Sequence, residues 1–67
     1  MSVARITEVE SSSDRSFEHA IELGIQRAGQ TLNNIQGAWV KEQKVVCDGA
    51  KITEYRVIMK VTFVLDD

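Results

Sequence analysis

The chain has only 67 residues, and this shortness is the strongest constraint on how it can fold. A domain of this size buries only about 60% of the surface that its unfolded chain exposes, so disulfides, a metal or oligomerisation usually supplement its core. Cys47 is the only cysteine and His19 is the only histidine, which excludes an intrachain disulfide, a cysteine-based zinc site and a His-rich metal site. We therefore expect one domain, residues 1–67, that assembles with copies of itself.

The charge pattern narrows the classes of partner. Eight Lys and Arg residues stand against ten Asp and Glu residues, and the basic residues are scattered along the chain. A nucleic-acid-binding protein usually carries a basic stripe, so nucleic acid is a poor candidate partner. No apolar run has the length of a signal peptide or approaches the roughly 20 residues that cross a bilayer. We expect a cytoplasmic protein without a membrane partner, and a single free thiol fits a reducing compartment.

The first half of the sequence predicts a strand followed by a helix. Residues 3–9 are rich in β-branched side chains, which favours a strand, and the cluster 11–14 (Ser-Ser-Ser-Asp) offers helix-capping oxygens, so we expect the helix to begin there. Asn33 and Asn34 should end the helix, with Gly37 at its exit. Apolar or small residues recur at helical spacing on one face, namely Phe17, Ala20, Ile21, Gly24, Ile25, Ala28 and Leu32.

The second half predicts a hairpin of two long strands. Extended runs at 38–47 and 51–65 flank the pair Asp48-Gly49, which is a strong hairpin-turn signal. If these two residues form the turn, Trp39 faces Ile58 and Lys41 faces Arg56 across the hairpin. The helix then returns the chain so that the last strand lies in the middle. The expected fold is α+β, a three-stranded antiparallel sheet (β-α-β-β) wrapped around one helix.

Side-chain alternation divides the sheet into two faces. The face expected to cover the helix carries Ala38, Val40, Tyr55, Val57, Met59, Val61, Phe63 and Leu65. The opposite face is expected to carry Trp39, Lys41, Gln43, Val45, Ile52, Glu54, Arg56, Ile58 and Lys60. One short helix cannot reach the four apolar side chains on that second face, and clustered exposed apolar groups usually mark an interface or a ligand surface. We therefore look for function there.

The order of these elements and several short motifs resemble the dodecin family over essentially the whole chain. The motifs are Ser16-Phe17-Glu18, Arg27-Ala28, the run 30–34 (Gln-Thr-Leu-Asn-Asn) and the closing strand 55–65. The resemblance implies a hollow homododecamer built from trimers, in which the outer sheet face makes subunit contacts and, in many members, paired flavin sites. It also implies storage or buffering of a small molecule in place of catalysis.

In that family a Trp near the start of the second strand stacks on the flavin ring, and a Gln on the last strand hydrogen-bonds to the ring's polar edge. Aligned on this sequence, the stacking position is Gly37 and the Gln position is Arg56, while the only Trp is Trp39. Two residues along a strand amount to about 6.6 Å, so a flavin bound in the family's mode would lose its platform, although Trp39 keeps the same face. We place the expected ligand site at Trp39, Arg56, Gly37, Ile58 and Lys41, with riboflavin, FMN or FAD as the implied cofactor.

Several of these residues have a second interpretation. Trp39 is either a ligand platform or an anchor between subunits. Arg56 either binds a phosphate or carboxylate, or forms an ion pair with Glu54 or a neighbouring subunit. We expect His19 to be solvated and Cys47 to be a passive small side chain.

Carboxylates offer a further alternative. Asp66 and Asp67 are one candidate pair, and Glu8 and Glu10 are another. Such carboxylates either bind Ca²⁺ or Mg²⁺ together with the same residues of symmetry-related copies, or they are solvated surface groups.

The sequence shows no catalytic constellation, so we expect that the protein is not an enzyme. Two functions follow: an assembly that sequesters a flavin or another planar or anionic small molecule, and a flavin-independent structural or ion-binding shell.

Overall fold

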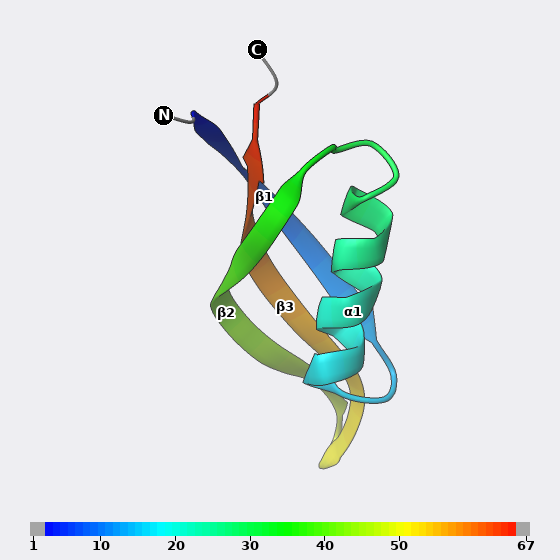
Figure 1. Ribbon diagram of the computed structural model, residues 1–67. Coiled ribbons are helices and arrows are strands. Elements are labelled where there is room, and N and C mark those ends of the chain that lie inside the picture. The colour runs from blue at the N-terminus through cyan, green and yellow to red at the C-terminus, as the bar shows by residue number, and fades with distance from the viewer. Residues whose placement is uncertain (1–2, 66–67) are drawn as a thin grey trace.

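The structure, a computed structural model, describes residues 3–65 and contains one helix packed on one face of a three-stranded sheet (Figure 1). The elements are β1 (Ala4–Ser13), α1 (Phe17–Ala28), β2 (Ile35–Asp48) and β3 (Lys51–Val64). The strands are antiparallel in the order β1-β3-β2. This confirms the predicted β-α-β-β fold with the last strand in the middle.

The serine cluster belongs to β1 and does not cap the helix. Ser13 pairs with Tyr55 of β3, so the strand continues four residues past its predicted end. The helix cap is Ser16, whose Oγ accepts a hydrogen bond from the His19 backbone N–H at 3.0 Å. Ser13 Oγ accepts a hydrogen bond from the Arg15 backbone N–H at 2.9 Å and so holds the turn between strand and helix. The predicted helix start was too early because β3 is long enough to pair the serines.

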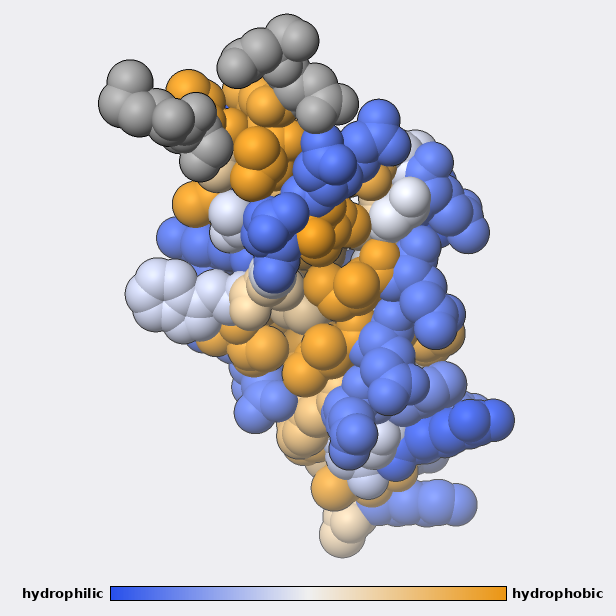
Figure 2. Space-filling view, viewed as in Figure 1, coloured by the Kyte–Doolittle hydropathy of each residue, from blue (hydrophilic) through white to orange (hydrophobic). Residues whose placement is uncertain are grey.

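The predicted apolar stripe of α1 packs against the sheet. Ala20, Gly24 and Ala28 are buried, and Phe17, Ile21 and Ile25 are partly buried. They cover the alternate residues of β3 that were predicted to face the helix, of which Val57, Met59 and Val61 are fully buried. Hydrophobic side chains form a band beside α1, while hydrophilic ones follow the outer side of the helix (Figure 2). Burial of Val57, Met59 and Val61 under α1 is the main stabilising contribution within one protomer.

The helix ends earlier than the sequence predicted. Its last residue is Ala28, and the Gly29 N–H donates to the Ile25 carbonyl at 2.9 Å. Asn34 does adopt a left-handed conformation, with φ of 61°, but it lies in the connection to β2. Gly37 lies inside β2 and does not mark the helix exit. No helix among the described residues is long and apolar enough to cross a membrane.

The hairpin turn consists of Gly49 and Ala50, one residue later than predicted. Asp48 stays in β2 and pairs with Lys51. Gly49 has φ of +63° and takes the first loop position, where the tight type II′ turn needs a positive φ. The predicted register was therefore wrong, since it placed Asp48 in the turn.

Bulges change the pairing further along β2. Lys41 is the extra residue of a bulge between Val40 and Glu42. Beyond it Trp39 pairs with Lys60 and not with Ile58, as the later turn requires. Arg56 pairs with Lys44 instead of Lys41, and Ile58 pairs with Glu42. Sequence alternation does not reveal a bulge, because the extra residue is chosen by backbone pairing and twist.

These irregularities move three predicted outer residues to the other face of the sheet. After the bulge at Lys41, Val45 pairs with Tyr55, and after a second irregularity Ile52 pairs with Cys47. Directly paired residues share a face, so Val45, Gln43 and Ile52 lie on the helix side of the sheet. The prediction that they lie on the outer face was wrong. Trp39 and Ile58 do lie on the outer face.

Candidate functional site

The sheet face opposite α1, called the outer face below, carries an exposed Trp beside two lysines. Trp39 is 75% exposed, the largest fraction among the exposed large apolar side chains. With Val40, Lys41 and Lys60 it lines a hollow of about 150 Å³. An indole this exposed offers a flat apolar surface that a protomer alone leaves in water.

The two lysines beside Trp39 differ in their partners. The Lys41 ammonium reaches across β3 to Glu8 of β1, with a distance of 3.4 Å between Nζ and Oε2. This contact places the bulged Lys41 side chain on the outer face. Lys60 lies directly opposite Trp39 and forms no ion pair with the described residues. Lys60 is thus a cation available to a ligand or a neighbouring subunit, and reasoning from the sequence missed it because the expected register put Ile58 there.

Arg56 is engaged in an ion pair within the protomer. Its Nε lies 3.0 Å from Oε1 of Glu54, as one of the two sequence interpretations held. The hydrogen bond from Arg56, with a second from Ser12, holds the pKa of Glu54 below its ordinary value. The same bond raises the pKa of Arg56. Glu10 and Ser12 line the polar hollow around this pair.

Trp39 and Arg56 do not share a site within one protomer. Their partners across the hairpin are Lys60 and Lys44, so four residues of β3, about 13 Å, separate them. Half-buried Ile58 lies between them. Within one protomer the two side chains line separate hollows.

Gly37, the position that aligns with the family's stacking Trp, lies opposite Thr62 on the outer face. A Cβ atom there would meet no atom within 4 Å, and the backbone φ is not in the left-handed region. A Cβ atom at position 37 therefore causes no clash and no backbone strain in the protomer.

Two residues expected to be passive differ from one another. His19 is not simply solvated, because its Nδ1 lies 2.6 Å from Oγ of buried Ser13. Cys47 is exposed near the end of β2.

Among residues 3–65 no three His, Cys, Asp or Glu side chains are grouped to hold a metal ion. Asp66 and Asp67, which the cation alternative invoked, lie outside the described residues.

One helix on a three-stranded sheet defines a small α+β protein, and exposed Trp39 marks the uncovered sheet face as a candidate ligand or subunit surface. The family model Dodecin matches residues 3–66, and the chain belongs to the dodecin family. Dodecins are small ligand-binding proteins, and membership implies self-assembly into oligomers.

Individual relatives match over nearly their full length. Calcium dodecin of Mycobacterium tuberculosis is 33% identical over 63 residues, which are 94% of this chain and 89% of the relative. The dodecin of Streptomyces davaonensis superposes with a TM-score of 0.93 at 35% identity, covering 98% of this chain and 97% of that one. A mutant of the Thermus thermophilus dodecin gives a TM-score of 0.94 at 30% identity with both chains covered completely.

Proposed function

We propose that this protein is a non-enzymatic, hollow homododecamer built from trimers that binds a small planar ligand of the flavin type and stores or sequesters it in the cytoplasm. The observation that carries the proposal is the 75% exposure of Trp39 on the sheet face that α1 leaves uncovered. Family membership supports both assembly and small-ligand binding.

The outer face suggests how a planar ligand is held. Its ring stacks on Trp39, a contact that contributes about 0.5–1.5 kcal/mol beyond the buried area. Lys60 and Lys41 lie beside the indole and supply donors for the ligand's polar edge or an anionic group. Ile58 supplies apolar surface, and Arg56 reaches the ligand from a neighbouring subunit. The open space above Gly37 leaves room for the part of the ligand that extends past Trp39.

An ion-binding shell is the second candidate, and the M. tuberculosis relative, named for calcium, favours it. Because residues 3–65 of one protomer contain no group of three metal-ligating side chains, a calcium site would combine carboxylates of several copies. Glu10 is the best-placed contributor, since it forms no ion pair with the described residues, whereas Glu8 is engaged by Lys41.

Titration of riboflavin and FMN with the purified protein, followed by flavin fluorescence, tests the first candidate. We expect quenching at micromolar protein in the unmodified chain. Trp39→Ala should weaken the affinity about tenfold, as loss of a stacking platform implies, and Trp39→Phe should retain most of it. Absence of quenching by either flavin would remove the flavin proposal. Calcium bound tightly after dialysis, lost with Glu10→Gln, would then favour the ion-binding shell.

A further inference from the structure

The β2–β3 hairpin projects beyond the N-terminal end of α1 (Figure 1). The first helical residue, Phe17, packs edge-to-face on Tyr55 with 5.2 Å between ring centroids, and beyond Tyr55 the hairpin continues to its turn. Its helix side carries an apolar surface formed by Val45, Cys47 and Ile52, which we call the hairpin tip. Val45 is 40% and Ile52 is 46% exposed. These side chains therefore stay partly exposed to water in their own protomer.

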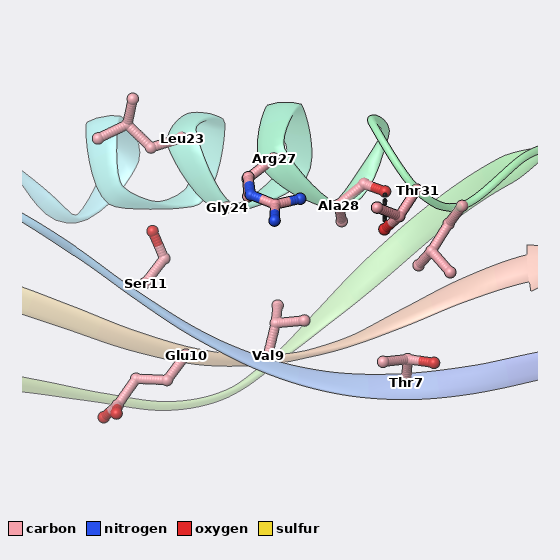
Figure 3. Close-up of a pocket in the computed structure, with 10 residues that line it drawn as sticks. Thr7, Val9, Glu10, Ser11, Leu23, Gly24, Arg27, Ala28 and Thr31 are labelled. Atoms are coloured by element: carbon pink, nitrogen blue, oxygen red, sulfur yellow. Dashed lines mark hydrogen bonds between the residues drawn. The ribbon is translucent and has the colours of Figure 1, made fainter.

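An open groove lies on the same side of the sheet, between α1 and the edge strand β1 (Figure 3). It has a volume of about 390 Å³ and is walled by Leu23, Gly24 and Ala28 from the helix and by Val9 and Ser11 from the strand. Gly24, Ala28 and Ser11 are small, so their side chains do not project far into the groove. The groove is therefore mostly apolar and unfilled.

We infer that the hairpin tip of one copy of this chain docks in the groove of the next copy. This inference rests on the proposed self-assembly and assigns the surfaces that produce it. A projecting apolar surface and an apolar groove on the same chain are complementary in shape, and burying both removes exposed apolar area from water.

The charges around the two surfaces are complementary as well. The Arg27 guanidinium lies at the groove and forms no ion pair with the described residues, while Asp48 lies at the end of β2 beside the tip. Docking brings this opposite-charge pair to the rim of the apolar contact, which fixes orientation more than affinity.

Tip and groove are different surfaces, so the contact between copies is heterologous. Each copy donates its tip and receives another, and such a contact repeated by a rotation closes into a ring. A trimer is a ring of this kind. The inference thus explains how trimers form without using the outer face, which stays available for the ligand.

Complementation between two variants tests the inference. Ile52→Glu disables the tip and Leu23→Glu, at a 39% exposed position, disables the groove. Each variant alone should have a native mass well below that of the unmodified assembly while keeping its far-ultraviolet circular dichroism. An equimolar mixture should form a heavier species than either variant alone, because one intact tip meets one intact groove. Variants that assemble like the unmodified chain would overturn the inference.

A charge exchange tests the orientation independently of packing. Arg27→Asp and Asp48→Arg should each weaken assembly, and the double variant should restore it, whereas Glu22→Lys on the exposed side of α1 should have no effect. A double variant no better than its parents would contradict the orientation. A monomeric unmodified protein would remove the proposed self-assembly itself, which is a result distinct from failure of these surfaces alone.

Discussion

Gly24 of α1 lies directly over Met59 at the centre of β3. A Cβ atom at position 24 would stand 2.6 Å from Cε of Met59 and 3.0 Å from Cβ of Ser11. Met59 is fully buried, so its side chain has little room to move. The close approach of helix and sheet depends on this glycine.

Gly24→Val should therefore destabilise the protein. We expect a loss of about 1–3 kcal/mol, since added methyl groups force apart a packed core. Urea unfolding followed by circular dichroism measures it at fixed protein concentration. Gly29→Ala is the matched control, because Gly29 has an ordinary helical φ and its nearest Cβ contact is 3.4 Å, and it should be nearly neutral. Equal stability of the Val variant would show that the helix does not depend on this contact.

Gly37→Trp should restore the stacking platform at the family's position. The space there is open and the backbone is unstrained, so the indole can lie on the outer face near Trp39. We expect flavin affinity to rise about three- to tenfold, which corresponds to roughly 0.5–1.5 kcal/mol of aromatic stacking. Gly37→Leu, large but not aromatic, should leave the affinity near that of the unmodified chain. An equal gain with Leu would indicate simple apolar contact.

Ser13→Ala should be more damaging than the same change one residue earlier. Ser13 Oγ is the partner of both the Arg15 N–H and the His19 ring, and it is 6% exposed. Removing it should cost about 1–2 kcal/mol, because partly buried polar groups lose their hydrogen bonds. Ser12 lies on the exposed outer side, so Ser12→Ala should change the free energy of unfolding by much less. Thermal unfolding of both variants gives the comparison.

The ion pair of Glu54 and Arg56 predicts a titration shift. The pKa of Glu54 is lowered in the folded protein, so the pair's small, salt-screened contribution to stability is present above the ordinary pKa of 4.5 and is lost as the pH falls through the lowered value. Carboxyl-carbon NMR of Glu54 measures this pKa directly. Arg56→Gln should move it upward, toward its ordinary value. A pKa that does not respond to this substitution would contradict the assigned cause.

The fold was predictable because the spacing of apolar residues along β3 and α1 identifies their buried sides even though β2 contains bulges. The alternate residues of β3 from Val57 to Phe63 are buried as their spacing indicated, and the helical stripe including Ala20 and Gly24 covers them. A helix and a sheet leave these patterns because each buries one side of a regular element.

The site was only partly predictable because it depends on the hairpin register. The sequence located Trp39, Arg56 and Ile58 on the outer face, but one residue in the turn and one at Lys41 decide which side chains are neighbours. The positive φ of Gly49 and the bulge arise from backbone geometry that alternation does not report. Lys60, the neighbour of Trp39, was missed for this reason. The roles of Trp39, Arg56, Gly37, Ile58 and Lys41 in ligand binding stay predictions.

The central claim is that this chain works as an assembly of identical subunits. Native mass spectrometry of the purified protein tests it most directly, because it reports the subunit number and any retained ligand in one spectrum. We predict a mass near twelve times the 7.5 kDa of the chain. A folded species at 7.5 kDa across the concentration range of the measurement would contradict the account.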